Sequence, residues 1–166
     1  MGKTMEKVLV KNYYDSFLAE KGLIKPSEIR SVEIDAIVDT GATYLCLPPK
    51  VIEELGLKYA YMKPVKTGNG SLELRIFRGA EIIIKDRSAD MRVMENKDDN
   101  VSALIGYLVL EAMDWVVNPK SQGIMGNPLN DGKWVRYVLI LSVSSHSITF
   151  LISVQRLMVN VCQETN

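Results

Sequence analysis

The chain has 166 residues, a length typical of one domain, with 47% apolar and 24% charged residues as in an ordinary soluble domain. The formal net charge is zero and the pI is near 6.6, so no basic field indicates a nucleic-acid partner. The two cysteines, Cys46 and Cys162, and the single histidine, His146, offer neither the spacing of a metal site nor a disulfide framework.

The N-terminal third predicts strands rather than helices. Residues 6–11 form a short apolar-alternating run, which predicts a strand. Residues 12–25 are mixed and predict no more than one helical turn, at 17–20. A second strand is expected over 29–38, and its apolar end is typical of a buried strand.

The middle of the chain predicts one short helix and a hairpin. Pro49 opens the helix, and Gly56 is well placed just after its end. Residues 57–65 are extended, and residues 71–78 alternate between apolar and polar side chains. Gly79 is expected to break this second strand.

Further short elements complete an all-β pattern. We expect strands at 80–85, 91–95, 115–117 and 123–125, and a helix over 107–113. The helix offers three apolar side chains to the core: Leu108, Leu110 and Ala112. Many short strands with turn signals and one or two short helices predict a closed, barrel-like all-β fold.

The most informative stretch is the hexapeptide 38–43, Val-Asp-Thr-Gly-Ala-Thr, directly after the buried strand. It places one carboxylate, Asp39, on a tight turn. Gly41 allows the turn and a close approach by another chain, and the hydroxyls of Thr40 and Thr43 can fix the loop. The stretch resembles the catalytic loop of aspartic proteases, whose signature is Asp-Thr/Ser-Gly.

The signature occurs once, which determines the expected assembly. Aspartic protease chemistry needs two carboxylates a few ångströms apart that share one proton. One chain therefore supplies half of a site, and a two-fold homodimer would bring Asp39 against its own copy. This is the arrangement of the retropepsins.

Two companions of the loop strengthen the resemblance. Leu104-Ile105-Gly106, followed by the expected helix, is similar to the element that packs beside the catalytic loop in that family. A sequence typical of a β-hairpin lies between the Asp39 loop and this element, at the place where retropepsins have the flap. The flap residues are Thr67, Gly68, Asn69, Gly70 and Ser71. The resemblance covers 29–127 and is closest to the small single-domain prokaryotic members. Viral members have a basic residue after the glycine where this chain has Tyr107.

The resemblance implies a function for each part of the loop. Asp39 from each chain would hold the lytic water, and Thr40 would hydrogen-bond across the two-fold axis. The Gly41 backbone would bind a peptide or protein substrate beneath residues 67–71. Ala42 and Thr43 complete the active-site loop. No metal or organic cofactor is implied, since the nucleophile is an activated water.

Two other functions compete for the same residues. The chain could be a dimeric retropepsin-fold scaffold or peptide-binding module without catalysis, because fold does not establish activity. The hexapeptide also resembles the phosphate-binding turn of actin-like and sugar-kinase ATPases, but those folds need a second phosphate loop and more length.

The expected organisation has three parts: an N-terminal strand and connector (1–28), a protease domain (29–127) and a tail (128–166). Residues 138–154 of the tail carry no formal charge, so a membrane span competes there with extra strands or with sequence outside the enzyme. Residues 1–4 are followed by charge rather than an apolar run, so we expect a cytoplasmic protein without a signal peptide.

Overall fold

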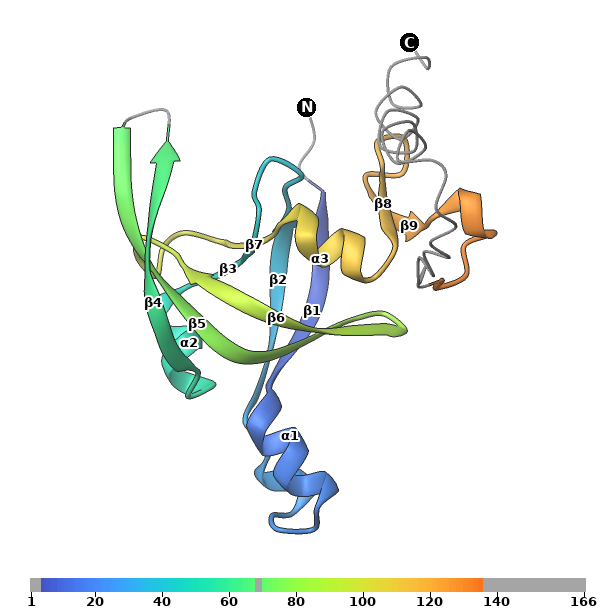
Figure 1. The fold of residues 1–166 in the computed structure, drawn as a ribbon. Helices are drawn as coiled ribbons and strands as arrows, with labels where there is room; N and C mark the ends of the chain where they lie inside the picture. The colour runs from blue at the N-terminus through green and yellow to red at the C-terminus, as the bar shows by residue number, and fades with distance from the viewer. Residues whose placement is uncertain (1–3, 68–69, 136–166) are drawn as a thin grey trace, which may run out of the picture. The chain divides into compact units, whose positions relative to one another are not determined.

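The computed structural model describes residues 4–67 and 70–135, whose fold is shown in Figure 1. The chain divides into two units, Met1–Arg136 and Tyr137–Asn166, and the second lies outside the described residues. The uncharged stretch of the tail, His146 and Cys162 therefore also lie outside them. Among the described helices, none has the length and apolar character needed to cross a membrane.

Within the described residues, seven strands form one sheet, and six of them close into a barrel. Neighbours follow the order β1-β2-β7-β3-β6-β5, and β1 pairs back onto β5 to close the ring, while β4 pairs with β5 outside it. The strands are β1 (Met5–Asn12), β2 (Ser31–Val38), β3 (Leu45–Leu47), β4 (Lys58–Thr67), β5 (Gly70–Ile84), β6 (Arg87–Glu95) and β7 (Ala103–Ile105). The expected all-β, closed barrel-like fold is confirmed.

Side chains at alternate strand positions fill the barrel. Val8 and Val10 of β1 are 1% and 0% exposed, and Ile82 and Ile84 of β5 are both fully buried. A strand turns every second side chain to the same face, so each strand delivers alternate residues to the interior. Burying each of these side chains stabilises the fold by about 1.5–3 kcal/mol. The other strands add Ala36, Leu45, Leu47, Val93 and Ile105.

The helix that follows β1 is longer than the sequence predicts. Helix α1 spans Tyr13–Glu20, two full turns rather than one turn at 17–20. The Asn12 side chain caps it by accepting hydrogen bonds from the backbone N–H groups of Tyr14 and Asp15 at 2.9 and 3.2 Å. The buried Asn12 amide also donates to the Leu55 carbonyl at 2.8 Å. This tertiary contact fixes the cap at residue 12.

The second helix is found where the sequence predicts it. Helix α2 spans Pro49–Glu54, and Gly56 follows its cap with φ +60°. The Leu57 N–H donates to the Ile52 carbonyl at 3.2 Å, which ends the helix in a left-handed turn. A side chain at Gly56 would also overlap the Arg30 guanidinium. Glycine is therefore required here on both counts.

Gly79 does not end a strand, contrary to the expectation. Strand β5 continues through it, and the pairing with β6 shifts between Phe77 and Ala80, which is a β-bulge. Gly79 has φ +90°, and a Cβ atom there would lie 2.5 Å from the Tyr14 ring. The glycine lets the strand bend against α1. Strand β6 likewise begins at Arg87, earlier than expected.

Helix α3 spans Tyr107–Ala112, close to the predicted range, but its buried face differs. Val109, Leu110 and Met113 at the end of the helix are at most 5% exposed, and Leu108 and Ala112 are half-buried. The expected set had a spacing of two, which suits a strand. Positions i, i+1 and i+4 share a helix face because the helix repeats every 3.6 residues.

The predicted terminal strands are present as the hairpin β8 (Trp115–Asn118) and β9 (Gly123–Gly126). The buried Arg87 side chain connects this hairpin to the barrel. Its guanidinium donates to the carbonyls of Met113 and Asp114 at 2.6 and 2.7 Å and lies 4.0 Å from the Trp115 ring centroid. Two 3₁₀ turns complete the described elements: Pro26–Glu28 and Pro128–Asn130.

Candidate active site

The Asp-Thr-Gly loop joins β2 to β3 and presents its carboxylate to solvent. Asp39, Thr40 and Gly41 are exposed, and Ala42 and Thr43 are half-buried. The Gly41 N–H donates to the Asp39 carboxylate oxygen Oδ1 at 2.9 Å, and the Ala42 N–H donates to the Asp39 carbonyl at 3.1 Å. The loop is a hydrogen-bonded turn that fixes the carboxylate at the end of a barrel strand.

Strand β7 lies between the two strands that carry this loop. It runs parallel to β2, with Val38 opposite Ile105, and pairs with β3 through Leu104 and Cys46. The Asp39 N–H donates to the Ile105 carbonyl at 3.0 Å. The Asp39 loop and strand β7, which only the family resemblance linked in the sequence, are thus in direct contact. The buried strand β7 holds the base of the loop.

Gly106 packs against the backbone of the loop itself. A Cβ atom at this position would lie 2.6 Å from the Thr43 carbonyl carbon and 2.7 Å from the Ala42 carbonyl oxygen, and closer still to the Tyr44 carbonyl. The next N–H group, of Tyr107, donates to the Ala42 carbonyl at 2.8 Å. The chain needs glycine here because backbone meets backbone without room for a side chain.

The residues expected to form the flap lie at the end of a long hairpin formed by β4 and β5. Strand pairing continues to the pairs Lys66–Ser71 and Thr67–Gly70, and the connecting residues Gly68 and Asn69 lie outside the described residues. Gly70 has φ +120°, a conformation that L side chains rarely adopt. In Figure 1 the β2–β3 loop and the ends of β4 and β5 that adjoin the turn lie toward the same side of the barrel, at the top of the view.

A small apolar cluster joins the hairpin to the loop side of the barrel. Cys46, Ile76 and Met94 form its buried centre. The partly buried side chains packed against them are Tyr44, Val65, Leu74 and Leu104. The cluster brings residues of β4 and β5 against β3, β7 and the end of the loop. It forms an apolar floor beside the Asp39 loop.

Two polar residues at this floor were not identified from the sequence. The Lys63 ammonium on β4 donates to the Tyr44 hydroxyl at 2.6 Å and lies 4.6 Å from the centre of the Tyr44 ring. Lys63 and Val65 are two positions apart in a strand, and this spacing puts both side chains on the same strand face. The sequence does not indicate that Tyr44 contacts Lys63, because β4 and the loop are far apart along the chain.

The Cys46 thiol is electrostatically linked to the loop. Burial raises its pKa to about 11, and the negative charge of Asp39 contributes in the same direction. The thiol is buried, with 6% of the residue exposed. Its thiolate is strongly disfavoured, so Cys46 acts as an apolar packing group beside the candidate site.

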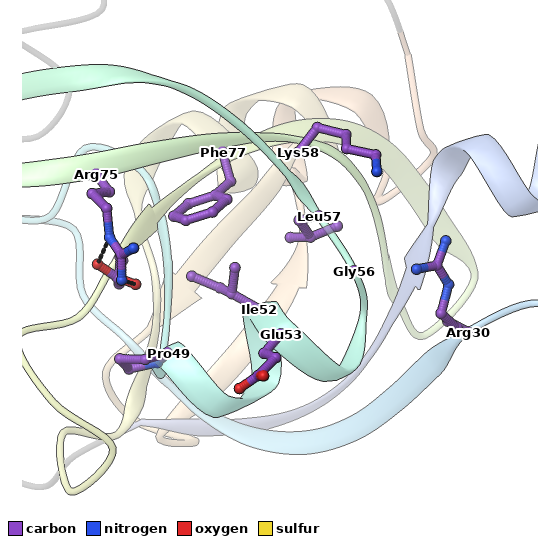
Figure 2. A pocket seen from close by; sticks show the side chains of 10 residues that line it. Arg30, Pro49, Ile52, Glu53, Gly56, Leu57, Lys58, Arg75 and Phe77 are labelled. Atoms are coloured by element: carbon purple, nitrogen blue, oxygen red, sulfur yellow. Dashed lines mark hydrogen bonds and ion pairs between the residues drawn. The ribbon is translucent and has the colours of Figure 1, made fainter.

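A cavity of about 450 Å³ lies on another part of the barrel, between α2 and the strands β4 and β5. Figure 2 shows Ile52, Leu57, Phe77 and Arg75 around it. Arg75 forms an ion pair with Glu95, which also lines the cavity. Among the described residues, none from the Asp39 loop, from the turn end of the β4–β5 hairpin or from β7 lines it. Among the described residues, no cluster of three or more His, Cys, Asp or Glu side chains could hold a metal ion.

The barrel, the Asp-Thr-Gly loop and the glycine packed behind it define a retropepsin-like fold of the aspartic protease class. Residues 26–112 match the model of the family described as gag-polyprotein putative aspartyl protease. The match covers more than half of the 166-residue chain, so the chain belongs to this family. A search of curated proteins gives no match.

Proposed function

We propose that this chain is one half of a homodimeric aspartic endopeptidase, with Asp39 from each copy forming the catalytic dyad. The observation that carries the proposal is the single exposed carboxylate of an Asp-Thr-Gly loop in a chain that belongs to an aspartyl protease family. Asp39 is held by backbone at the end of β2, a strand in which only Ala36 is buried rather than the fully buried strand expected, and it is open to solvent in the single chain. A second copy facing this loop supplies the missing carboxylate.

The chemistry follows from two carboxylates that share one proton. Like charges a few ångströms apart cannot both ionise, so one Asp39 stays protonated while the other is a carboxylate. The carboxylate takes a proton from a bound water as the water attacks the scissile carbonyl carbon. The protonated partner donates a hydrogen bond to the carbonyl oxygen, where negative charge develops. Collapse of the tetrahedral species then breaks the C–N bond as the amine is protonated.

The remaining loop residues have supporting roles in this proposal. Thr40 is exposed next to Asp39, where it can hydrogen-bond to the partner loop. Gly41 leaves its backbone accessible to an extended substrate. The β4–β5 hairpin covers the substrate from above, since its inner face already packs beside the loop.

The test is cleavage of a randomised octapeptide library by the purified full chain, compared with Asp39→Asn. The substitution is nearly isosteric, and an amide oxygen can still accept the Gly41 hydrogen bond, so the fold should be retained. We expect sequence-dependent cleavage by the wild type and none by the variant. Cleavage by Asp39→Asn at the wild-type rate would place the chemistry elsewhere. No cleavage by a folded, dimeric wild type would favour the non-catalytic scaffold.

A further inference from the structure

The Lys63 ammonium has donors that no described carboxylate uses. Four basic side chains of the barrel are ion-paired: Lys7 with Glu33, Arg30 with Asp15, Arg75 with Glu95 and Lys85 with Glu6. Arg92, like Lys63, donates to a tyrosine hydroxyl, that of Tyr61, at 2.9 Å. The hydrogen bond of Lys63 goes to a phenol oxygen instead. An ammonium carries three N–H donors, and Tyr44 occupies one of them.

The surroundings of Lys63 are aromatic, and one of these rings, Tyr61, also contacts the Arg92 guanidinium. The pKa of Lys63 is raised above the ordinary lysine value, first by the hydrogen bond to Tyr44 and more weakly by the nearby phenols Tyr61 and Tyr107. Tyr44 directly follows the Asp39 loop, and Tyr107 directly follows Gly106. The cation therefore lies close to both segments that build the candidate site, although it belongs to the hairpin.

The Tyr44 hydroxyl adds a donor to the same place. Its oxygen accepts from Lys63, so its own proton can be donated to another group. The pair offers two N–H donors and one O–H donor beside the apolar floor of Val65, Leu74 and Leu104. A group that accepts hydrogen bonds and carries negative charge fits these donors best.

We propose that Lys63 and Tyr44 form a subsite that selects a substrate with a glutamate or aspartate side chain near the scissile bond, among apolar residues. The inference rests on the proposed peptidase function and names the substrate class of that site. The substrate carboxylate accepts from the Lys63 ammonium and the Tyr44 hydroxyl, while neighbouring substrate side chains pack on the apolar floor.

The experiment compares acidic and isosteric neutral side chains at every position of a randomised octapeptide library. Cleavage by the wild type is read as the Glu:Gln and Asp:Asn ratio at each position around the cut. Because hydrogen bonds to a charged group contribute more than neutral ones, we expect a ratio of about ten at one position. Lys63→Met should reduce the ratio to about one, and Lys63→Glu should invert the preference towards lysine. Lys58→Met, on the same strand but at the distant cavity, is the matched control and should keep the wild-type ratio.

A second measurement separates this inference from the activity. The same library is passed over two immobilised proteins, the single variant Asp39→Asn and the double variant that combines Asp39→Asn with Lys63→Met. If the single variant retains acidic peptides and the double variant does not, the subsite is supported. If, in addition, the wild type cleaves no peptide, the peptidase function is refuted. Cleavage without an acidic preference, or with one that survives Lys63→Met in a folded protein, would overturn the subsite and leave the peptidase standing. Neither cleavage nor Lys63-dependent retention would overturn both.

Discussion

Replacing Gly106 with alanine tests how the Asp39 loop is held. The added methyl group would lie 2.6 and 2.7 Å from backbone atoms of Thr43 and Ala42, well inside contact distance. Backbone cannot rotate away as a side chain can, so the loop or α3 must shift. Overpacking of this kind costs about 1–3 kcal/mol. The shift also weakens the hydrogen bond from Tyr107 to the Ala42 carbonyl, worth about 1 kcal/mol.

We therefore expect Gly106→Ala to lower the free energy of unfolding by about 3 kcal/mol, measured by urea denaturation of the full chain. Peptide cleavage should fall further than stability explains, because the loop carries Asp39. Gly123→Ala is the matched control: its Cβ atom would meet nothing closer than 3.5 Å, so its stability should stay near that of wild type. A Gly106→Ala protein as stable as this control, with wild-type activity, would refute the packing argument.

Three further predictions concern buried polar groups. The hydrogen bond from Arg30 holds the pKa of the Asp15 carboxyl below its ordinary value. This ion pair therefore contributes its full stabilisation at pH values above the pKa of Asp15 in the unfolded chain. The contribution is lost as the pH falls through the lower pKa of Asp15 in the folded protein. Asp15→Asn should thus cost about 1 kcal/mol in urea denaturation at pH 7, screened by the half-exposed Arg30, and progressively less as the pH falls below the ordinary aspartate range; a cost that does not change with pH would contradict this. Cys46, with a pKa of about 11, should resist iodoacetamide at pH 8 in the folded protein and react after unfolding, as peptide mapping would show; rapid labelling of folded protein would mean the thiol is accessible. Arg87→Lys should lower stability by about 2 kcal/mol, because one ammonium cannot reach the separate carbonyls that the buried guanidinium joins; an unchanged urea midpoint would show that those bonds contribute little.

The parts of the site that sequence predicts are those with a local steric or conformational requirement. The Asp39 loop needs a turn at the end of a strand, and Gly106 is required where two backbone segments meet. Gly56 is identified in the same way, as the left-handed residue that ends α2. Each of these positions can be inferred from a few neighbouring residues, so the barrel and the loop were predictable.

The parts that sequence misses depend on contacts between distant segments. Helix α1 begins at Tyr13 because Asn12 is held by the Leu55 carbonyl, a partner far along the chain. Gly79 was interpreted as a strand end, since nothing local indicates that Tyr14 packs over it and that the strand continues through a bulge. The contact of Lys63 with the active-site side of the barrel is of the same kind.

The central claim is that two copies of Asp39 build one active site, and subunit mixing tests it most directly. Wild-type and Asp39→Asn protein are mixed at constant total concentration, allowed to exchange subunits, and assayed for peptide cleavage. If each active site needs an aspartate from both chains, activity follows the square of the wild-type fraction, so an equal mixture retains about a quarter of the full rate. Activity proportional to the wild-type fraction, about half in the equal mixture, would mean that each chain works alone and would contradict the shared site.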